Sequence, residues 1–268
     1  QRAGVVYETE DPGSGVGAGF YRFLPDDPRR LARGGSLQML GIKGRPGVDL
    51  RKGQHIGQPL EVVWFHIADP APDYEVNNDP RSVFNQGYGQ GGALFNRLEG
   101  CWEDEGTIYF VSTSGGDAEN GDVNSDGYKE GFGQVWEYRP SSRNGGRLTL
   151  VFESPEGAVL DSPDNLTVTP RGGLLLCEDD ASSDSDIVGD LAPGITDVNR
   201  LIGLTPGGDP FPFAVNRLND SEFAGACFSP DGSTLFVNIL GGTRGTIDEL
   251  AGTGMTCAIT GPWADGPL

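Results

Sequence analysis

Short runs in which apolar and polar residues alternate recur along the chain, and glycine-bearing turns separate them in pairs. Alternation with a period of two is typical of strands that bury one face, and a tight turn between two such runs predicts a β-hairpin. Three predicted hairpins align when their turns are superposed, at residues 100–113, 166–179 and 226–239. Their turn glycines, Gly106, Gly172 and Gly232, are 66 and 60 residues apart, which indicates a repeat architecture.

Each hairpin is followed by further strand-like runs. GQVWEYRP (133–140) and NRLIGLTP (199–206) match a third strand, while RLTLVFES (147–154) and PFPFAV (210–215) match an outer strand. Four short antiparallel strands in each repeat are typical of a propeller blade. The sequence therefore predicts an all-β fold, a β-propeller built from four-stranded blades.

The two ends of the chain fit the repeat only in part. VVYETED (5–11) matches a second strand with no first strand before it, and TCAITGPW (256–263) matches a third. We therefore expect residues 1–268 to form a single propeller segment of about three to four blades. Because open sheet edges favour aggregation, we expect a missing N-terminal segment or a companion chain to complete the propeller. Residues 44–95 do not match the repeat and are predicted to be a long insertion.

Composition narrows the range of functions. The 268 residues include 43 glycines and 19 prolines, which favours many turns over long helices. A formal net charge of −20 argues against a nucleic-acid partner, and the lack of a long apolar run argues against a membrane-spanning segment. The four cysteines lack the C-x-x-C spacing of zinc ribbons and thioredoxins, so they are buried thiols or a disulfide.

Acidic or amide side chains recur at the predicted strand ends on one side of the blades. They are Glu10, Asp11, Glu99, Asp164, Asn165, Glu178, Asp179 and Glu222. Inner strands of a propeller line its central channel, so these residues are expected to converge there. Carboxylates brought together repel one another, and a bound cation removes that repulsion, which predicts an axial metal site. The alternative is that acids, 39 in all, simply collect in loops.

One cationic side chain accompanies this predicted site. Arg97 stands two residues before Glu99, and residues i and i+2 of a strand share a face. A guanidinium beside metal-binding carboxylates is suited to hold an oxyanion such as phosphate, because its fork matches two oxygens. A structural Arg–Glu ion pair is the other interpretation.

A second candidate metal site lies in the loop DVNSDGYKE. Its oxygen-bearing residues, at alternate positions and followed by a glycine, are Asp122, Asn124, Asp126 and Glu130. This spacing is typical of calcium loops, and an ordinary polar turn is the alternative. The two histidines, His55 and His66, pair with no nucleophile in the sequence, so a Ser-His-Asp hydrolase has little support.

Several motifs together resemble a known family. RLEGCW, IYFVSTSGG, GQVWEY, SPDNLTVTPRGGLLLCED and SEFAGACFSPDGSTLFVNI occur in this order and resemble the later half of the PhoX-type alkaline phosphatases, secreted bacterial enzymes built on a propeller. The resemblance implies an axial pocket that holds calcium and iron. It also implies that Arg97 contacts phosphate, and that Glu99, Asp179, Glu222 and either Glu10 or Asp11 bind metal. The cysteine that ligates iron in the family belongs to the earlier half.

These observations favour a metal-dependent phosphatase that is secreted or periplasmic. Its substrates would be small-molecule phosphate monoesters, and inorganic phosphate would be released. Two alternatives remain, a calcium-dependent lactonase or esterase on a propeller and a non-catalytic calcium-binding propeller. Hydrolysis of a phosphate ester, compared with that of a lactone, distinguishes the three.

Overall fold

The computed structural model describes residues 4–13, 16–73, 79–117, 121, 123–142, 144–179, 195, 197–242, 252–263 and 265–267. Strands dominate this part of the chain, and its helices are the 3₁₀ turn η1 (Leu31–Arg33) and α2 (Ser82–Tyr88). The strands are β1 (Val6–Thr9), β2 (Gly17–Ala18), β3 (Phe20–Pro25), β4 (Gly35–Ile42), β5 (Pro59–His66), β6 (Phe95–Asn96), β7 (Leu98–Asp104), β8 (Thr107–Ser112), β9 (Gln134–Ser142), β10 (Gly145–Glu153), β11 (Pro163–Val168), β12 (Leu174–Glu178), β13 (Arg200–Leu204), β14 (Pro210–Val215), β15 (Phe223–Phe228), β16 (Thr234–Ile239) and β17 (Met255–Thr260). None of these helices has the length and apolar character needed to cross a membrane.

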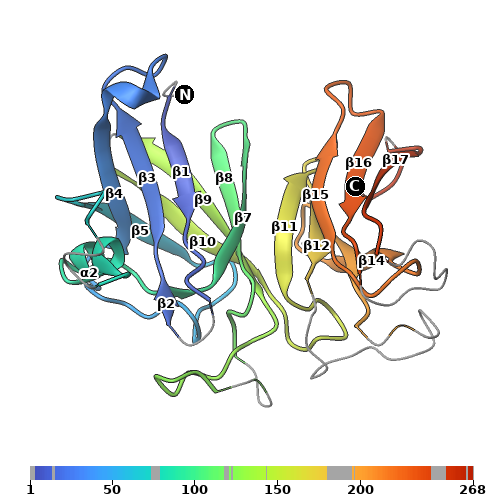
Figure 1. The fold of residues 1–268 in the computed structure, drawn as a ribbon, viewed down its shortest axis with the longest axis horizontal. Coiled ribbons are helices and arrows are strands. Elements are labelled where there is room, and N and C mark those ends of the chain that lie inside the picture. The colour runs from blue at the N-terminus through green and yellow to red at the C-terminus, as the bar shows by residue number, and fades with distance from the viewer. Residues whose placement is uncertain are drawn as a thin grey trace.

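The strands form antiparallel meanders that follow the chain order. β7 to β10 make one four-stranded blade, β11 to β14 make the next, and β15 to β17 make a three-stranded group. The leading strands β7, β11 and β15 lie next to one another, with β1 on the other side of β7 (Figure 1). The all-β propeller with four-stranded blades is therefore confirmed.

The predicted hairpins are present at the three aligned positions. β7 pairs with β8, β11 with β12 and β15 with β16, each in antiparallel register. The turn glycines Gly106, Gly172 and Gly232 have φ angles of 84°, 80° and 70°, a region that residues with a Cβ rarely adopt. The common glycine in the sequence pattern therefore reflects a backbone requirement of each turn.

The first strands of the chain join the blade formed by β7 to β10. β1, β3 and β4 pair in order, β5 pairs with β4, and β5 also pairs with the outer strand β10. The result is an eight-stranded sheet whose end strands β1 and β7 are in contact, so the sheet is nearly closed. Aromatic side chains fill it: the rings of Phe20 and Phe110 stack with centroids 4.2 Å apart, and Trp136 is fully buried.

The range 44–95 is more regular than the sequence indicated. It supplies β5, which continues the first sheet, as well as α2. The long glycine-containing connection 43–58 replaces the tight turn expected between neighbouring blade strands, so the sequence pattern of β5 stands apart from the repeat.

All four cysteines are free thiols. Burial raises the pKa of Cys101 to about 12 and that of Cys177 to about 12, so both remain protonated near neutral pH. Cys177 is part of the apolar core between the blade β11–β14 and the group β15–β17, together with Leu201 and Leu235. The free-thiol interpretation therefore holds and the disulfide alternative does not, although only Cys177 is fully buried and the other three cysteines are partly buried.

Candidate functional site

Strand ends from four parts of the chain meet at one end of the sheets. β1 and β12 run toward this end, where Asp11 and Asp179 follow them. β7, β11 and β15 start from the same end, where Glu99 and Asp164 are the second residues of β7 and β11 and Glu222 lies just before β15. The direction of β1 matches that of a second blade strand, in agreement with the sequence pattern.

We call this group the acidic cluster. Its members are Asp11, Arg97, Glu99, Asp164, Asp179 and Glu222. It is the convergence that the repeat pattern predicted, because equivalent ends of successive blades face the same axis.

Arg97 forms a two-pronged ion pair within the cluster. Its Nε donates to Asp11 Oδ1 at 3.1 Å, and its Nη2 donates to Asp11 Oδ2 at 3.2 Å. The same Nη2 lies 3.2 Å from Glu99 Oε1, so Arg97 and Glu99 share a face as predicted. The three side chains are 22–30% exposed, which leaves them accessible to a ligand from solvent.

The backbone is strained beside the cluster. Arg97 has a φ of 41° and Ser162 a φ of 44°, both in the left-handed region that side chains disfavour. The Arg97 carbonyl accepts from Thr113 N at 2.9 Å, and the Ser162 carbonyl accepts from Asp179 N at 3.0 Å. Hydrogen bonds from the residues that directly follow the second strands β8 and β12 therefore hold both strained residues in place. Strain of this kind is frequent at functional sites.

The carboxyl groups of the cluster shift one another's pKa values. Burial, followed by hydrogen bonds to Asp11 and Asp164, raises the pKa of Glu99 to about 9. Burial also acts to raise the pKa of Asp11, but hydrogen bonds from Arg97 and Glu99 outweigh it and lower that pKa. Near neutral pH, Glu99 is therefore the protonated partner and Asp11 the ionised one.

The other side of the cluster has no such cation among the residues described. Burial and the nearby charges of Asp179 and Asp164 raise the pKa of Glu222 to about 7. Burial and the charge of Asp164 also raise the pKa of Asp179, although Arg97 acts in the opposite direction. Asn165 Nδ2 donates to Asp164, and Asn165 Oδ1 accepts from Gly225 N at 2.9 Å, which fixes the middle of the cluster.

The donor set fits a hard cation. Carboxylate oxygens are the ligands that calcium prefers, and the raised pKa values of Glu99 and Glu222 show negative charge that Arg97 alone does not balance. Within the described residues, no three His, Cys, Asp or Glu side chains are arranged as metal ligands. The carboxyl groups of Asp11 and Glu99 contact Arg97 and each other.

Two of the predicted metal ligands lie apart from the cluster. Glu10 Oε2 accepts from Gly19 N and from Tyr21 Oη, each at 2.8 Å, so its carboxylate faces β3. Of the adjacent pair Glu10 and Asp11, the structure therefore places Asp11 in the cluster.

Glu178 is the other predicted ligand that lies elsewhere. It is fully buried and accepts from Arg200 Nε at 2.7 Å and from Asp161 N at 2.8 Å. Arg200 also donates to the carbonyls of Gly157 and Ala158, each at 2.8 Å. This arrangement joins β12, β13 and the connection before β11, which is a structural role.

The candidate calcium loop is tied to the body of the protein by Arg51. Asp126 Oδ2 accepts from Arg51 Nη1 at 2.6 Å, and Arg51 also pairs with Asp49 at 2.8 Å. Asn124 is buried and its Nδ2 donates to Asn96 Oδ1 at 3.3 Å, while Asn96 Nδ2 donates to Glu130 Oε1 at 3.3 Å. Asp122 lies outside the described residues.

Arg51 was not anticipated from the sequence. It lies 75 residues from Asp126, in the range predicted to be an insertion. Its guanidinium lies 4.4 Å from the centroid of the Tyr128 ring, which packs it against the loop. The only sequence signal was a basic residue in an acidic chain.

The fold and the cluster define an all-β protein with an acidic, arginine-containing site at the axial end of its blades. A family model described as alkaline phosphatase PhoX matches residues 1–241. The chain therefore belongs to the alkaline phosphatase PhoX family. A search of curated protein sequences finds no significant match.

Two solved structures show distant similarity to this chain. An oxidoreductase described as a glucose dehydrogenase, from Thermus thermophilus, is 16% identical with a TM-score of 0.36. The match covers 89% of this chain and 62% of that one, so the chain spans less than two thirds of that protein's length. A luciferin-regenerating enzyme is 12% identical with a TM-score of 0.36, and 96% of each chain is covered.

Proposed function

We propose that the chain is a metal-dependent phosphatase that hydrolyses small-molecule phosphate monoesters at the acidic cluster and releases inorganic phosphate. The observation that carries this proposal is the two-pronged pairing of Arg97 inside a group of carboxylates with excess negative charge. Membership in the alkaline phosphatase PhoX family supports it.

The carboxylates have the role of cation ligands in this proposal. Asp11, Glu99, Asp164, Asp179 and Glu222 would hold calcium and iron ions, since all five offer oxygen donors. Bound cations would offset the charge of the phosphate and of the oxygen on which negative charge develops. Asn165 keeps Asp164 oriented through its own hydrogen bonds to Asp164 and to the Gly225 backbone.

Arg97 has the role of phosphate clamp. Its fork now holds the two oxygens of Asp11, and a phosphoryl group presents two oxygens at similar spacing. When Asp11 serves as a cation ligand, the guanidinium is free to donate the same pair of N–H bonds to substrate. The strained φ of 41° and the backbone bond from Thr113 keep the side chain directed into the cluster.

The calcium loop has a separate, stabilising role in the proposal. Asn124, Asp126 and Glu130, with Asp122, would bind a calcium ion away from the catalytic cluster. We also propose a secreted or periplasmic location. The enzymes that this chain resembles are secreted, and calcium is available there to weak oxygen-ligand sites.

A direct comparison of substrates tests the proposal. We expect the chain loaded with calcium and iron to hydrolyse p-nitrophenyl phosphate, to lose this activity when both metals are removed, and to leave a simple lactone intact. Metal-dependent hydrolysis of the lactone alone would favour a lactonase, and hydrolysis of neither substrate would contradict a catalytic role for this chain.

A further inference from the structure

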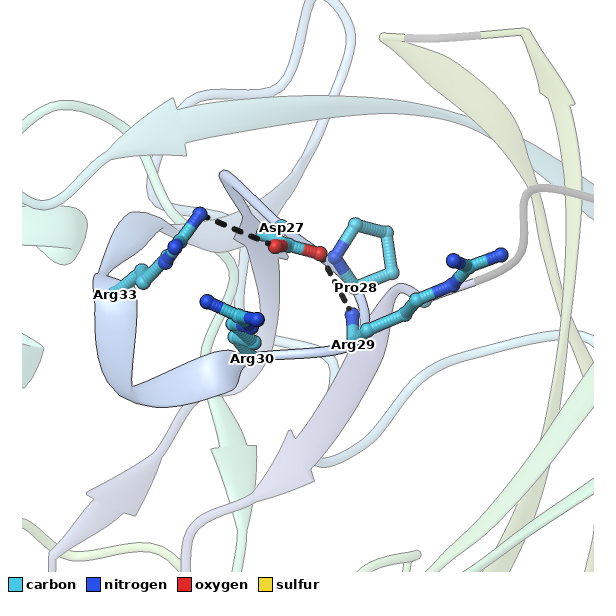
Figure 2. Close-up of a pocket in the computed structure, with 6 residues that line it drawn as sticks. Asp27, Pro28, Arg29, Arg30 and Arg33 are labelled. Atoms are coloured by element: carbon cyan, nitrogen blue, oxygen red, sulfur yellow. Dashed lines mark hydrogen bonds and ion pairs between the residues drawn. The ribbon is translucent and has the colours of Figure 1, made fainter.

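A pocket lies at the connection between β3 and β4, beside η1. It is lined by Gly4, Asp27, Pro28, Arg29, Arg30 and Arg33, and its volume is about 730 Å³ (Figure 2). Three of the 19 Lys and Arg residues of the chain thus lie within five positions of one another. This local concentration of positive charge contrasts with the net charge of −20 for the whole chain.

The pocket is separate from the acidic cluster. In the antiparallel register of β1 with β3, Thr9 faces Phe20 and Val6 faces Phe23. The acidic cluster therefore follows the end of β1 at one end of the sheet, and the β3–β4 connection lies at the opposite end. Figure 1 shows the N-terminal end of β1 beside this connection, away from β2.

The positive charge of the pocket is poorly matched by the protein itself. Asp27 is the acidic residue in its lining, and its Oδ2 lies 3.4 Å from Arg33 Nη1, a loose ion pair between partly exposed side chains. The other oxygen, Asp27 Oδ1, accepts a hydrogen bond from the backbone N of Arg29 at 3.0 Å. Among the described residues, the guanidinium groups of Arg29 and Arg30 have no ion pair or hydrogen bond.

The arrangement of the arginines indicates an extended ligand. Figure 2 shows the Arg30 and Arg33 side chains on one side of Asp27 and that of Arg29 reaching the other way. A volume of about 730 Å³ is within the range of small-molecule sites and is large for a single phosphate ion. Guanidinium groups recognise phosphate oxygens through paired N–H donors.

We propose that this pocket binds a polyanion that carries two or more phosphate groups. Arg30 and Arg33 engage one group and Arg29 engages another. Because the whole chain has a net charge of −20, this group of arginines provides local attraction for an anion that the chain as a whole repels. The site is distinct from catalysis, so it does not depend on the proposed function.

The phosphate groups can belong to a soluble polyphosphate or to lipid headgroups. Leu31, between Arg30 and Arg33, is 49% exposed, and an apolar side chain among arginines is suited to a lipid surface as well. The experiment therefore has one arm for each source: inorganic tripolyphosphate, followed by calorimetry, and phosphatidylglycerol vesicles, followed by co-sedimentation against phosphatidylcholine vesicles.

The test uses the whole chain in calcium-free buffer, so that tripolyphosphate does not act by removing calcium. The variant is Arg29→Gln/Arg30→Gln, which leaves every described contact intact because neither guanidinium has a partner among the described residues. The control is Arg45→Gln/Arg147→Gln, which removes the same charge from two exposed positions on other connections and strands. An unchanged thermal unfolding temperature confirms that both double variants are folded.

We expect the parent to bind at least one of the two probes, and the Arg29/Arg30 variant to bind it at least about tenfold more weakly. The control variant should stay within about twofold of the parent. Loss of tripolyphosphate binding identifies a soluble source, and loss of vesicle binding alone identifies a lipid source. Equal affinities of the parent and the Arg29/Arg30 variant for both probes, or no binding by the parent, would overturn the proposal.

Discussion

Arg97 and Asp11 meet through two hydrogen bonds, Nε to Oδ1 at 3.1 Å and Nη2 to Oδ2 at 3.2 Å, although 86 residues separate them in the chain. This pairing brings the end of β1 against the start of β7 and fixes the guanidinium inside the acidic cluster. The two predicted roles of Arg97, ion-pair partner and phosphate clamp, are therefore compatible, because the same fork serves both a carboxylate and a phosphoryl group.

Metal retention depends on the acidic cluster in this account. Glu222→Gln removes a carboxylate that faces Asp179 and Asp164, so we expect the bound calcium and iron to fall well below the parent level after dialysis. Glu156→Gln, at an exposed position outside the cluster, is the control and should keep the parent metal content. Elemental analysis of both variants makes the comparison, and equal metal content would contradict the assignment of Glu222.

The raised pKa values predict how stability changes with pH. In the metal-free protein, the folded state keeps protons on Glu222 up to about pH 7 and on Glu99 up to about pH 9, whereas the unfolded chain loses them near pH 4.5. The folded state thus binds more protons in this window, so the free energy of unfolding should fall as pH rises from about 4.5 to about 9.

Urea midpoints at pH 5, 7 and 9 measure this slope. Glu222→Gln should remove the fall in unfolding free energy between about pH 4.5 and 7. Bound calcium should also reduce the dependence of stability on pH, because its ligands are ionised in the folded state. Stability that rises with pH over this range in the metal-free protein would show that the carboxyl groups are not held in mutual contact.

The sequence pattern predicted the hairpins and the convergence of the acidic residues, since both follow from the repeat. Each turn glycine marks a backbone conformation, and the strand ends of the blades bring most of the predicted acids into the cluster. The pattern did not separate Asp11 from Glu10, because one residue decides which side of β1 a carboxylate faces. It also gave no sign that Glu178 pairs with Arg200, a contact that depends on how two strands pack.

The loop around Asp126 has two possible sources of stability, a calcium ion and the ion pair with Arg51. Asp126→Asn removes both, whereas Asp49→Asn weakens only the ion-pair network of Arg51. If the loop binds calcium, we expect calcium to raise the melting temperature of the parent and of Asp49→Asn, but much less that of Asp126→Asn. An equal calcium effect in all three proteins would assign the loop to the ion pair alone.

We expect Glu178 to stabilise the fold through its ion pair with Arg200 and not to bind metal. Glu178→Gln leaves the buried Arg200 without its carboxylate, so we expect a loss of about 3–5 kcal/mol in unfolding free energy. Glu61→Gln breaks the exposed pair with Lys43 and should cost no more than about 1 kcal/mol. The folded Glu178 variant should retain the metal content of the parent, and metal loss without loss of stability would return this residue to the set of ligands.

The most direct test of the central claim is the kcat/KM of Arg97→Lys for p-nitrophenyl phosphate, measured on metal-loaded protein together with its metal content. Lysine keeps the charge but lacks the two-pronged donor geometry that Arg97 presents to Asp11. We predict a loss of at least about tenfold in kcat/KM, about 1.4 kcal/mol of transition-state stabilisation, with the metals still bound. Full activity in Arg97→Lys, or activity and metals lost together, would contradict the assignment of Arg97 as the phosphate clamp.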